Sequence, residues 1–320
     1  MTSAVRPARW KILLAFAIIY LVWGSTFLAI RVGVHEVPPF LLAAMRFFVA
    51  GLVMYGWLRL TGTPGLTRRQ WIGASLLGGM IFVVDYGCLF WAEQRVPSGI
   101  AAVVLATIPV FITLFEIVLL RTQRLSVGLA GSLLLGIAGV AILMSNSFSL
   151  GEVPINRAGA AALLLAAFTW SIATVITRKT PLPESKAMSS ATQMLSGGAQ
   201  LIVVSALAGE FSAFHPRAVS WSAWLALAYL IVAGSIIGFT AYVWLLHYES
   251  PTKVGTYAYV NPVIAVLMGY FFAGEALGAR TVLGTLLVLV SVIAITLKPK
   301  PTGKSDLPAE ITPREEAVAS

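Results

Sequence analysis

Three ionisable side chains fall inside long apolar stretches of the sequence: Arg46, Asp85 and Glu116. A charge is costly in a membrane interior, so an ionisable residue there is a candidate contact for a substrate or a proton. Arg46 and Asp85 lie at similar distances from the predicted outer ends of their stretches, and we predict that they pair. The pair could instead be structural and neutralise itself. Glu116 lies near an inner end, where it could extend toward water or Arg121.

Aromatic and amide side chains recur at helical spacing in other apolar stretches. Aromatic walls with a few amide groups suit organic, partly apolar solutes. The faces are Tyr20, Trp23 and Phe27 beside Gly24; Tyr86, Phe90 and Trp91; Gln193, Gly197 and Gln200; and Tyr257 with Asn261. Helix packing explains Trp23 and Tyr257 as well as cavity lining does. Trp91 and Trp244 could instead anchor helices at the membrane surface.

Composition predicts the elements that position these residues. Of 320 residues, 58% are hydrophobic and 11% charged, whereas a soluble domain carries about 25% charged residues. Uncharged runs recur at about the 20-residue length of a membrane-crossing helix. We therefore predict an all-α polytopic membrane protein with ten transmembrane helices. The predicted spans are residues 10–30, 39–59, 70–91, 97–120, 126–145, 157–177, 187–209, 220–246, 252–273 and 279–298.

The connections between these spans are short and leave no room for a separate soluble domain. Residues 299–320 are rich in Pro and charge, and we predict a disordered cytoplasmic tail there. The first span lacks a small-residue cleavage site, so we predict a retained helix and not a signal peptide. The single cysteine, Cys88, excludes an intramolecular disulfide and a cysteine cluster.

The distribution of Lys and Arg predicts the orientation. With a cytoplasmic N-terminus, sixteen of the 22 basic residues fall inside and five outside, while Arg46 lies within a span. Basic residues concentrate on the cytoplasmic side of membrane proteins. We therefore predict an inner-membrane, multi-pass protein with both termini in the cytoplasm. The five outside residues are Arg31, Arg95, Arg157, Arg217 and Arg280.

The two halves of the chain resemble each other. Trp71, Trp91, Pro109 and Gly131 recur 153 positions later as Trp224, Trp244, Pro262 and Gly284, and Trp23 and Gly51 recur 147 positions later as Trp170 and Gly198. An internal repeat sets the whole architecture. We predict two five-helix repeats, residues 10–148 and 149–298. Since five is odd, the second repeat starts from the opposite side of the membrane.

Pro109 and Pro262 each lie near the middle of an apolar span. A proline removes a backbone donor, and in lipid the freed carbonyl is tolerated only where protein or a water-filled cavity satisfies it. Inverted repeats with irregular helices beside a midplane site are typical of secondary transporters. We predict that the two prolines kink helices around a shared cavity; alternatively, they bend helices for packing alone.

Four segments carry a family resemblance: WGSTFLAIRVG (23–33), PPFLLAAMRF (38–47), AEQRVPSGIAAVVLATIPVF (92–111) and SPTKVGTYAYVNPVIAVLMGYFFAGEAL (250–277). They resemble the EamA-type transporters of the drug/metabolite transporter superfamily, nearest to the YedA-like branch. The resemblance implies ten helices in two inverted repeats, a cavity lined mainly by helices 1, 3, 4, 6, 8 and 9, and export of small metabolites or drugs. In the first half, Arg121-Thr122 replaces the Gly-Glu pair that follows helix 9 as Gly274-Glu275.

Other classes fit less well. An intramembrane enzyme needs a nucleophile with a base or a metal cluster, and the three histidines are predicted in separate loops. A passive channel would show a filter or a ring of like charges. The net charge of +9 is spread over short loops and does not form a nucleic-acid patch. We therefore predict a monomeric secondary transporter without metal or cofactor, acting on a small organic solute such as an amino acid or a drug. Proton coupling, exchange and facilitated flow all remain open.

Overall fold

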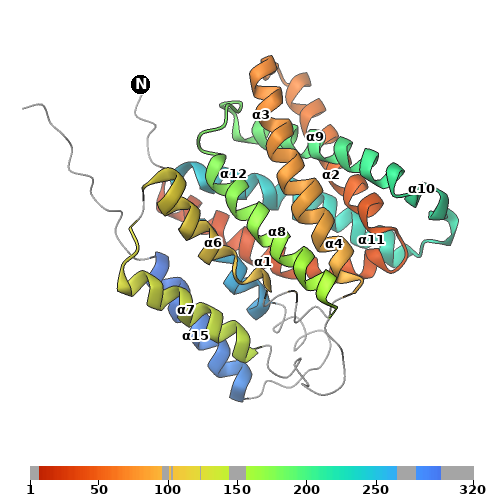
Figure 1. The fold of residues 1–320 in the computed structure, drawn as a ribbon. Coiled ribbons are helices and arrows are strands. Elements are labelled where there is room, and N and C mark those ends of the chain that lie inside the picture. Colours follow the sequence, from red (N-terminus) through yellow and green to blue (C-terminus); the bar gives the residue numbers. More distant parts are fainter. Residues whose placement is uncertain are drawn as a thin grey trace, which may run out of the picture.

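The structure of the protein is a computed structural model that describes residues 7–95, 101, 104–122, 124–143, 156–264 and 279–296. These residues form only helices and their connections (Figure 1). The helices in chain order are α1 (Arg9–Val34), α2 (Pro39–Leu60), α3 (Arg68–Gly78), η1 (Gly79–Tyr86), α4 (Gly87–Glu93), α6 (Ile108–Phe115), η2 (Glu116–Leu120), α7 (Val127–Leu143), α8 (Arg157–Ile176), α9 (Lys186–Leu207), α10 (Glu210–Ala213), η4 (Pro216–Ala218), α11 (Trp221–Tyr229), η5 (Leu230–Phe239), α12 (Thr240–Tyr248), α13 (Pro251–Val254) and α15 (Ala279–Thr296). Residues 257–264 are also helical.

Several of these helices have the length and composition of membrane spans. Five qualify among the described residues: α1, α2, the continuous helix Arg68–Glu93, α8 and the continuous helix Trp221–Tyr248. Every predicted span contains described helix, which confirms the all-helical membrane class. The number of crossings stays a prediction. The boundary at residue 148 and the tail at 299–320 lie outside the described residues.

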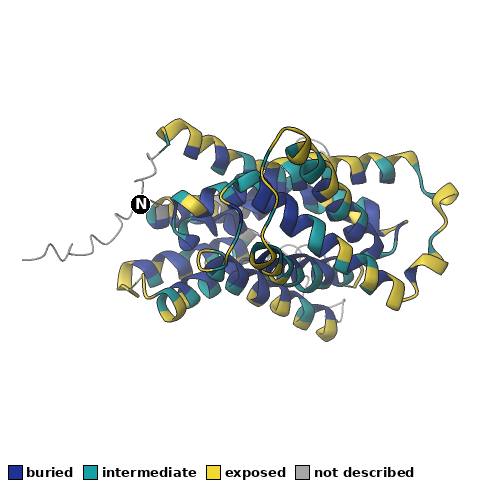
Figure 2. Ribbon diagram, turned by 90° about the horizontal axis from the view of Figure 1, so that it is seen from above, coloured by how far each residue is buried: buried dark blue, intermediate teal, exposed yellow. Residues whose placement is uncertain are grey.

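The outer surface of the bundle is apolar and its interior is tightly packed. Leucines on α1 and the Leu52, Val53 and Trp57 side chains on α2 are exposed. Exposed residues lie toward the outside of the bundle, while buried residues fill its middle (Figure 2). Exposed apolar side chains around a whole bundle are unfavourable in water and favourable in lipid. The surface therefore agrees with the class that the composition predicts.

Repeat-related helices pack against each other. α2 lies along α9, and α7 lies along α15 at one side of the bundle (Figure 1). A Cβ on Gly51 would lie 2.3 Å from the backbone N of Leu195, and a Cβ on Gly198 would lie 2.4 Å from that of Phe48. Residues 48 and 51 precede residues 195 and 198 by the same 147 positions. The contacts are therefore reciprocal, and α2 and α9 cross antiparallel.

The third and eighth predicted spans each contain a π-helical segment. In the first repeat it is η1, residues 79–86, and in the second it is η5, residues 230–239. Adding 153 to the first range gives 232–239, which lies inside the second. π-Helical segments inside α-helices occur frequently at functional sites. Both segments face the interior, where η1 carries the buried Asp85 and Tyr86.

Candidate functional site

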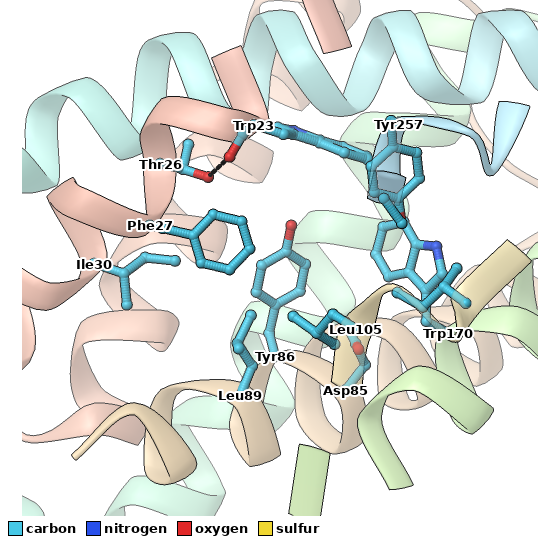
Figure 3. Close-up of a pocket in the computed structure, with 12 residues that line it drawn as sticks. Trp23, Thr26, Phe27, Ile30, Asp85, Tyr86, Leu89, Leu105, Trp170 and Tyr257 are labelled. Carbon is cyan, nitrogen blue, oxygen red and sulfur yellow. Dashed lines mark hydrogen bonds between the residues drawn. The ribbon is translucent and has the colours of Figure 1, made fainter. Parts of the chain in front are cut away.

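A cavity of about 50 Å³ lies between the two repeats. Its lining residues belong to α1, to η1 and α4, to residues 105–108 at the start of α6, to α8 and to the helix at 257–264. Figure 3 labels most of them. The lining residues are Trp23, Thr26, Phe27, Ile30, Asp85, Tyr86, Leu89, Leu105, Ile108, Trp170, Tyr257 and Ala258. These come from the first, third, fourth, sixth and ninth predicted spans. The eighth span contributes Tyr242 behind the lining and no lining residue.

Aromatic rings from both repeats form the wall of the cavity. Trp23 and Trp170, which are equivalent in the repeat, meet edge to face with ring centroids 5.6 Å apart. Tyr257 lies 4.8 Å from Trp23, and Tyr86 lies 5.9 Å from Trp170. Tyr242 packs against both tryptophans at 5.2 and 5.0 Å. Trp23, Tyr86, Trp170 and Tyr257 therefore line one space, and their contact with a substrate stays a prediction.

The π-helical segment η5 holds Trp23 in place. The indole N–H of Trp23 donates to the carbonyl of Gly234 at 3.0 Å. A Cβ on Gly238 would lie 2.6 Å from the same indole nitrogen. Only glycine at this position lets the ring approach the helix. The ring face is thereby fixed toward the cavity, as Figure 3 shows.

Asp85 is the one carboxyl group among the residues that line the cavity. It is 4% exposed and has no hydrogen bond or ion pair with any residue that the structure describes. The titratable groups within its electrostatic reach are Tyr86, Cys88, Tyr242 and Tyr257. None of these groups is basic. An isolated carboxylate in an apolar interior is unfavourable unless it is paired.

The predicted pair of Arg46 and Asp85 is wrong. Arg46 is 1% exposed, and its Nε donates to Ser235 Oγ at 2.8 Å. Its guanidinium lies 4.6 Å from the Phe47 ring centroid and 5.0 Å from that of Tyr86. Equal depth in the membrane does not set the direction of a side chain around its helix. Arg46 is also absent from the cavity lining.

Glu93 lies between the predicted spans 70–91 and 97–120, but in the structure it is the last residue of α4. Both its carboxylate oxygens are buried, and neither has a hydrogen bond to a described residue. Arg31 and Arg46 are the basic groups that act on it electrostatically. Arg31 and Arg46 therefore supply the positive charge that acts on this buried acid. In the sequence, the only sign of this buried acid is its position shortly after a predicted apolar span.

Glu116 does not extend toward water or Arg121. It is 2% exposed, and its Oε2 accepts hydrogen bonds from the backbone N–H and the hydroxyl of Thr252 at 3.1 and 2.7 Å. Its Oε1 accepts from Thr122 at 3.3 Å. Thr252 lies in the first turn of α13, where a carboxylate satisfies unpaired N–H groups. Glu116 therefore joins the end of the fourth predicted span to the start of the ninth.

Three further candidates lie outside the cavity lining. A Cβ on Gly24 would lie 2.6 Å from Ile264 Cβ, so Gly24 serves close packing of α1 and is a wrong cavity candidate. Gln193 donates to the Ser189 carbonyl and hydroxyl at 3.2 and 3.0 Å within α9. Asn261 is buried in the helix at 257–264, and it does not line the cavity.

The two prolines lie outside the cavity lining, and their role as kinks stays a prediction. Residues 106–107 form a turn, and Pro109 lies in the first turn of α6, where its missing N–H costs nothing. Pro262 lies within the helical residues 257–264. Neither proline lines the cavity, but Leu105 and Ala258, each four residues earlier, both do.

A helical bundle built from two related halves, with an apolar outer surface and a buried aromatic cavity, defines a membrane transporter of the two-repeat type. Residues 9–145 and 157–297 each match the EamA-like transporter family. The chain belongs to this family, which confirms the resemblance seen in the sequence. Its members are transporters and not enzymes.

Curated relatives cover most of the chain. The protein named "Uncharacterized inner membrane transporter YedA" from Escherichia coli (strain K12) is 37% identical over 282 residues, which is 87% of this chain and 88% of YedA. Protein PecM from Dickeya dadantii (strain 3937) is 26% identical over 86% of this chain and 88% of PecM. A solved structure described as "Crystal structure of protein" superposes with a TM-score of 0.70 and 23% identity, over 90% of this chain and 98% of that one. At this identity, the similarity concerns the fold.

Proposed function

We propose that this protein carries small organic solutes, metabolites or drugs, outward across a bacterial inner membrane by alternating access. It does so as a monomer of ten transmembrane helices in two inverted repeats, with both termini in the cytoplasm. YedA is named an inner membrane transporter, which supports this location. The direction of transport rests on the family resemblance.

The antiparallel, reciprocal packing of α2 against α9 carries this proposal. Repeats related by an axis along the membrane normal would place equivalent helices parallel, whereas an axis in the membrane plane places them antiparallel. The contacts of Gly51 with Leu195 and of Gly198 with Phe48 are antiparallel, which supports an axis in the membrane plane. Inverted repeats allow the two halves to exchange conformations around a site between them. Trp23 and Trp170 meet in such a place.

The size of the cavity supports a mechanism with moving helices. Ligand sites for organic molecules measure about 300–1,000 Å³, and this cavity measures about 50 Å³. A metabolite can therefore enter only if the helices around the cavity separate. A carrier that opens alternately to each side has this property, and a permanently open channel does not.

Flux into liposomes tests the proposal. The full chain is reconstituted and assayed with radiolabelled amino acids and amphiphilic amines, with protein-free liposomes as the control. A carrier shows saturable flux that speeds up when unlabelled solute is placed on the opposite side. Flux that rises linearly with concentration, without this acceleration, would indicate a channel. No flux with any solute would contradict transport of these classes.

A further inference from the structure

The cavity lining is acidic and aromatic, without a balancing positive charge. Asp85 is its carboxyl group, and the described residues that line it include no Lys, Arg or His. Arg46 is held by Ser235 and lies against the Phe47 and Tyr86 rings. The acidic group that acts on Arg46 electrostatically is Glu93. Asp85 therefore has no basic partner among the described residues, and a cation that enters the cavity would supply the partner that its ionised form needs.

Four aromatic rings lie around the same space as Asp85. Trp23, Trp170, Tyr86 and Tyr257 surround the cavity, and Asp85 projects from the same helix as Tyr86 (Figure 3). Aromatic faces attract organic cations, and cages of aromatic rings recognise ammonium groups. An anionic solute would meet Asp85 at close range, which is unfavourable in a site without water.

We propose that the cavity binds an organic ammonium ion, with Asp85 as its counter-ion and Trp23, Trp170, Tyr86 and Tyr257 as its aromatic cage. This inference rests on the proposed transport function and names the charge class of its substrate. The cavity of about 50 Å³ accommodates an ammonium head group, since a single water needs about 10–15 Å³ of such space. The remainder of the solute enters as the helices separate.

Three matched probes test the charge preference. The purified full chain in lipid nanodiscs is titrated at neutral pH with 2-phenylethylamine, 2-phenylethanol and 3-phenylpropionate, and binding is measured by calorimetry. These probes share a ring and differ in having a positive, neutral or negative head group. We expect the amine to bind about tenfold or more tightly than the other two, because only the amine pairs with a buried carboxylate. Equal binding of the three, or no binding of the amine, would overturn the proposal.

Two variants assign the preference to its residue. Asp85→Asn should lose the preference for the amine, and Asp85→Glu should retain part of it. Glu93→Gln is the matched control, because Glu93 is a buried acid further along the same helix that does not line the cavity. An unchanged preference in Asp85→Asn, or its loss in Glu93→Gln, would refute the assignment. If Asp85→Asn does not fold, the probe series on the unaltered chain still decides the charge preference.

Binding and flux separate this inference from the proposed function. Saturable flux of other solutes without amine binding would refute the ammonium site and leave transport intact. Amine binding without flux of any solute in liposomes would support the site and contradict the transport function.

Discussion

The contact between α2 and α9 can be broken by one methyl group. In Gly51→Ala, the new Cβ would lie 2.3 Å from the backbone N of Leu195, whereas ordinary contacts of a Cβ begin at 3.4 Å. The atoms it meets belong to backbone, which cannot rotate away, so the helices must separate locally by about 1 Å. Overpacking of this kind costs about 1–3 kcal/mol. Gly198→Ala should have a similar cost, because its Cβ would lie 2.4 Å from the backbone N of Phe48.

Thermal unfolding in detergent measures this cost. At about 2–4 °C per kcal/mol, the predicted decrease in Tm for Gly51→Ala is about 2–12 °C. Gly56→Ala is the matched control on the same helix, because a Cβ there has no neighbour within 4 Å. That variant should be neutral or gain about 0.5–1 kcal/mol from helix propensity. If Gly51→Ala and Gly56→Ala are equally stable, α2 and α9 do not approach each other as the structure has them.

Three further predictions concern the ends of the spans. Glu116→Gln should lower Tm, because an amide replaces the buried carboxylate that accepts from Thr252; an unchanged Tm would contradict this role. Hydrogen bonds from the backbone and side chain of Ser220 lower the pKa of Glu36 below its usual 4.5, so its contribution to stability is complete above that pH and is lost on acidification through the lowered pKa. Glu36→Gln should therefore weaken the fall of Tm between pH 6 and pH 3, and the same fall in both proteins would count against it. After Cys88 is replaced, a cysteine at Ser3 should resist an impermeant thiol reagent in intact cells; labelling from outside would refute a cytoplasmic N-terminus.

The sequence predicts the helices well because their cause is local. A run of apolar residues long enough to cross a membrane defines a span without reference to any partner, and every predicted span contains described helix. Repeated residues were also informative, since Trp23 and Trp170 meet in the structure. Each of these signals is a property of a single stretch or of a comparison between two stretches.

Contacts between side chains were predicted poorly because they depend on how each helix is rotated. Arg46 and Asp85 share a depth but point to different neighbours. The π-helical segments alter that rotation, since they add residues to a turn. Apart from the glycines at 78 and 79, nothing in the sequence pattern predicts the π-helical segments. Glu93 was missed because a boundary error of a few residues moved it from a buried end into a loop.

The repeat duplicates the framework and not the charges. Trp23 and Trp170, Gly51 and Gly198, and the two π-helical segments occur in both halves. By the same shifts, Arg46 corresponds to Gln193, Asp85 to Gly238 and Glu116 to Gly269.

At the position equivalent to Asp85, the glycine makes room for the Trp23 ring. Trp23 and Asp85 both belong to the first half, so the second half has a glycine where the first half supplies the carboxylate of the cavity. An exchange of conformations needs symmetry in the helices that move, because each half must adopt the shape of the other. Recognition needs no such symmetry, because a single carboxylate suffices for a single solute. On the proposed mechanism, the duplicated helices thus serve the motion, and the single carboxylate serves the recognition of the solute.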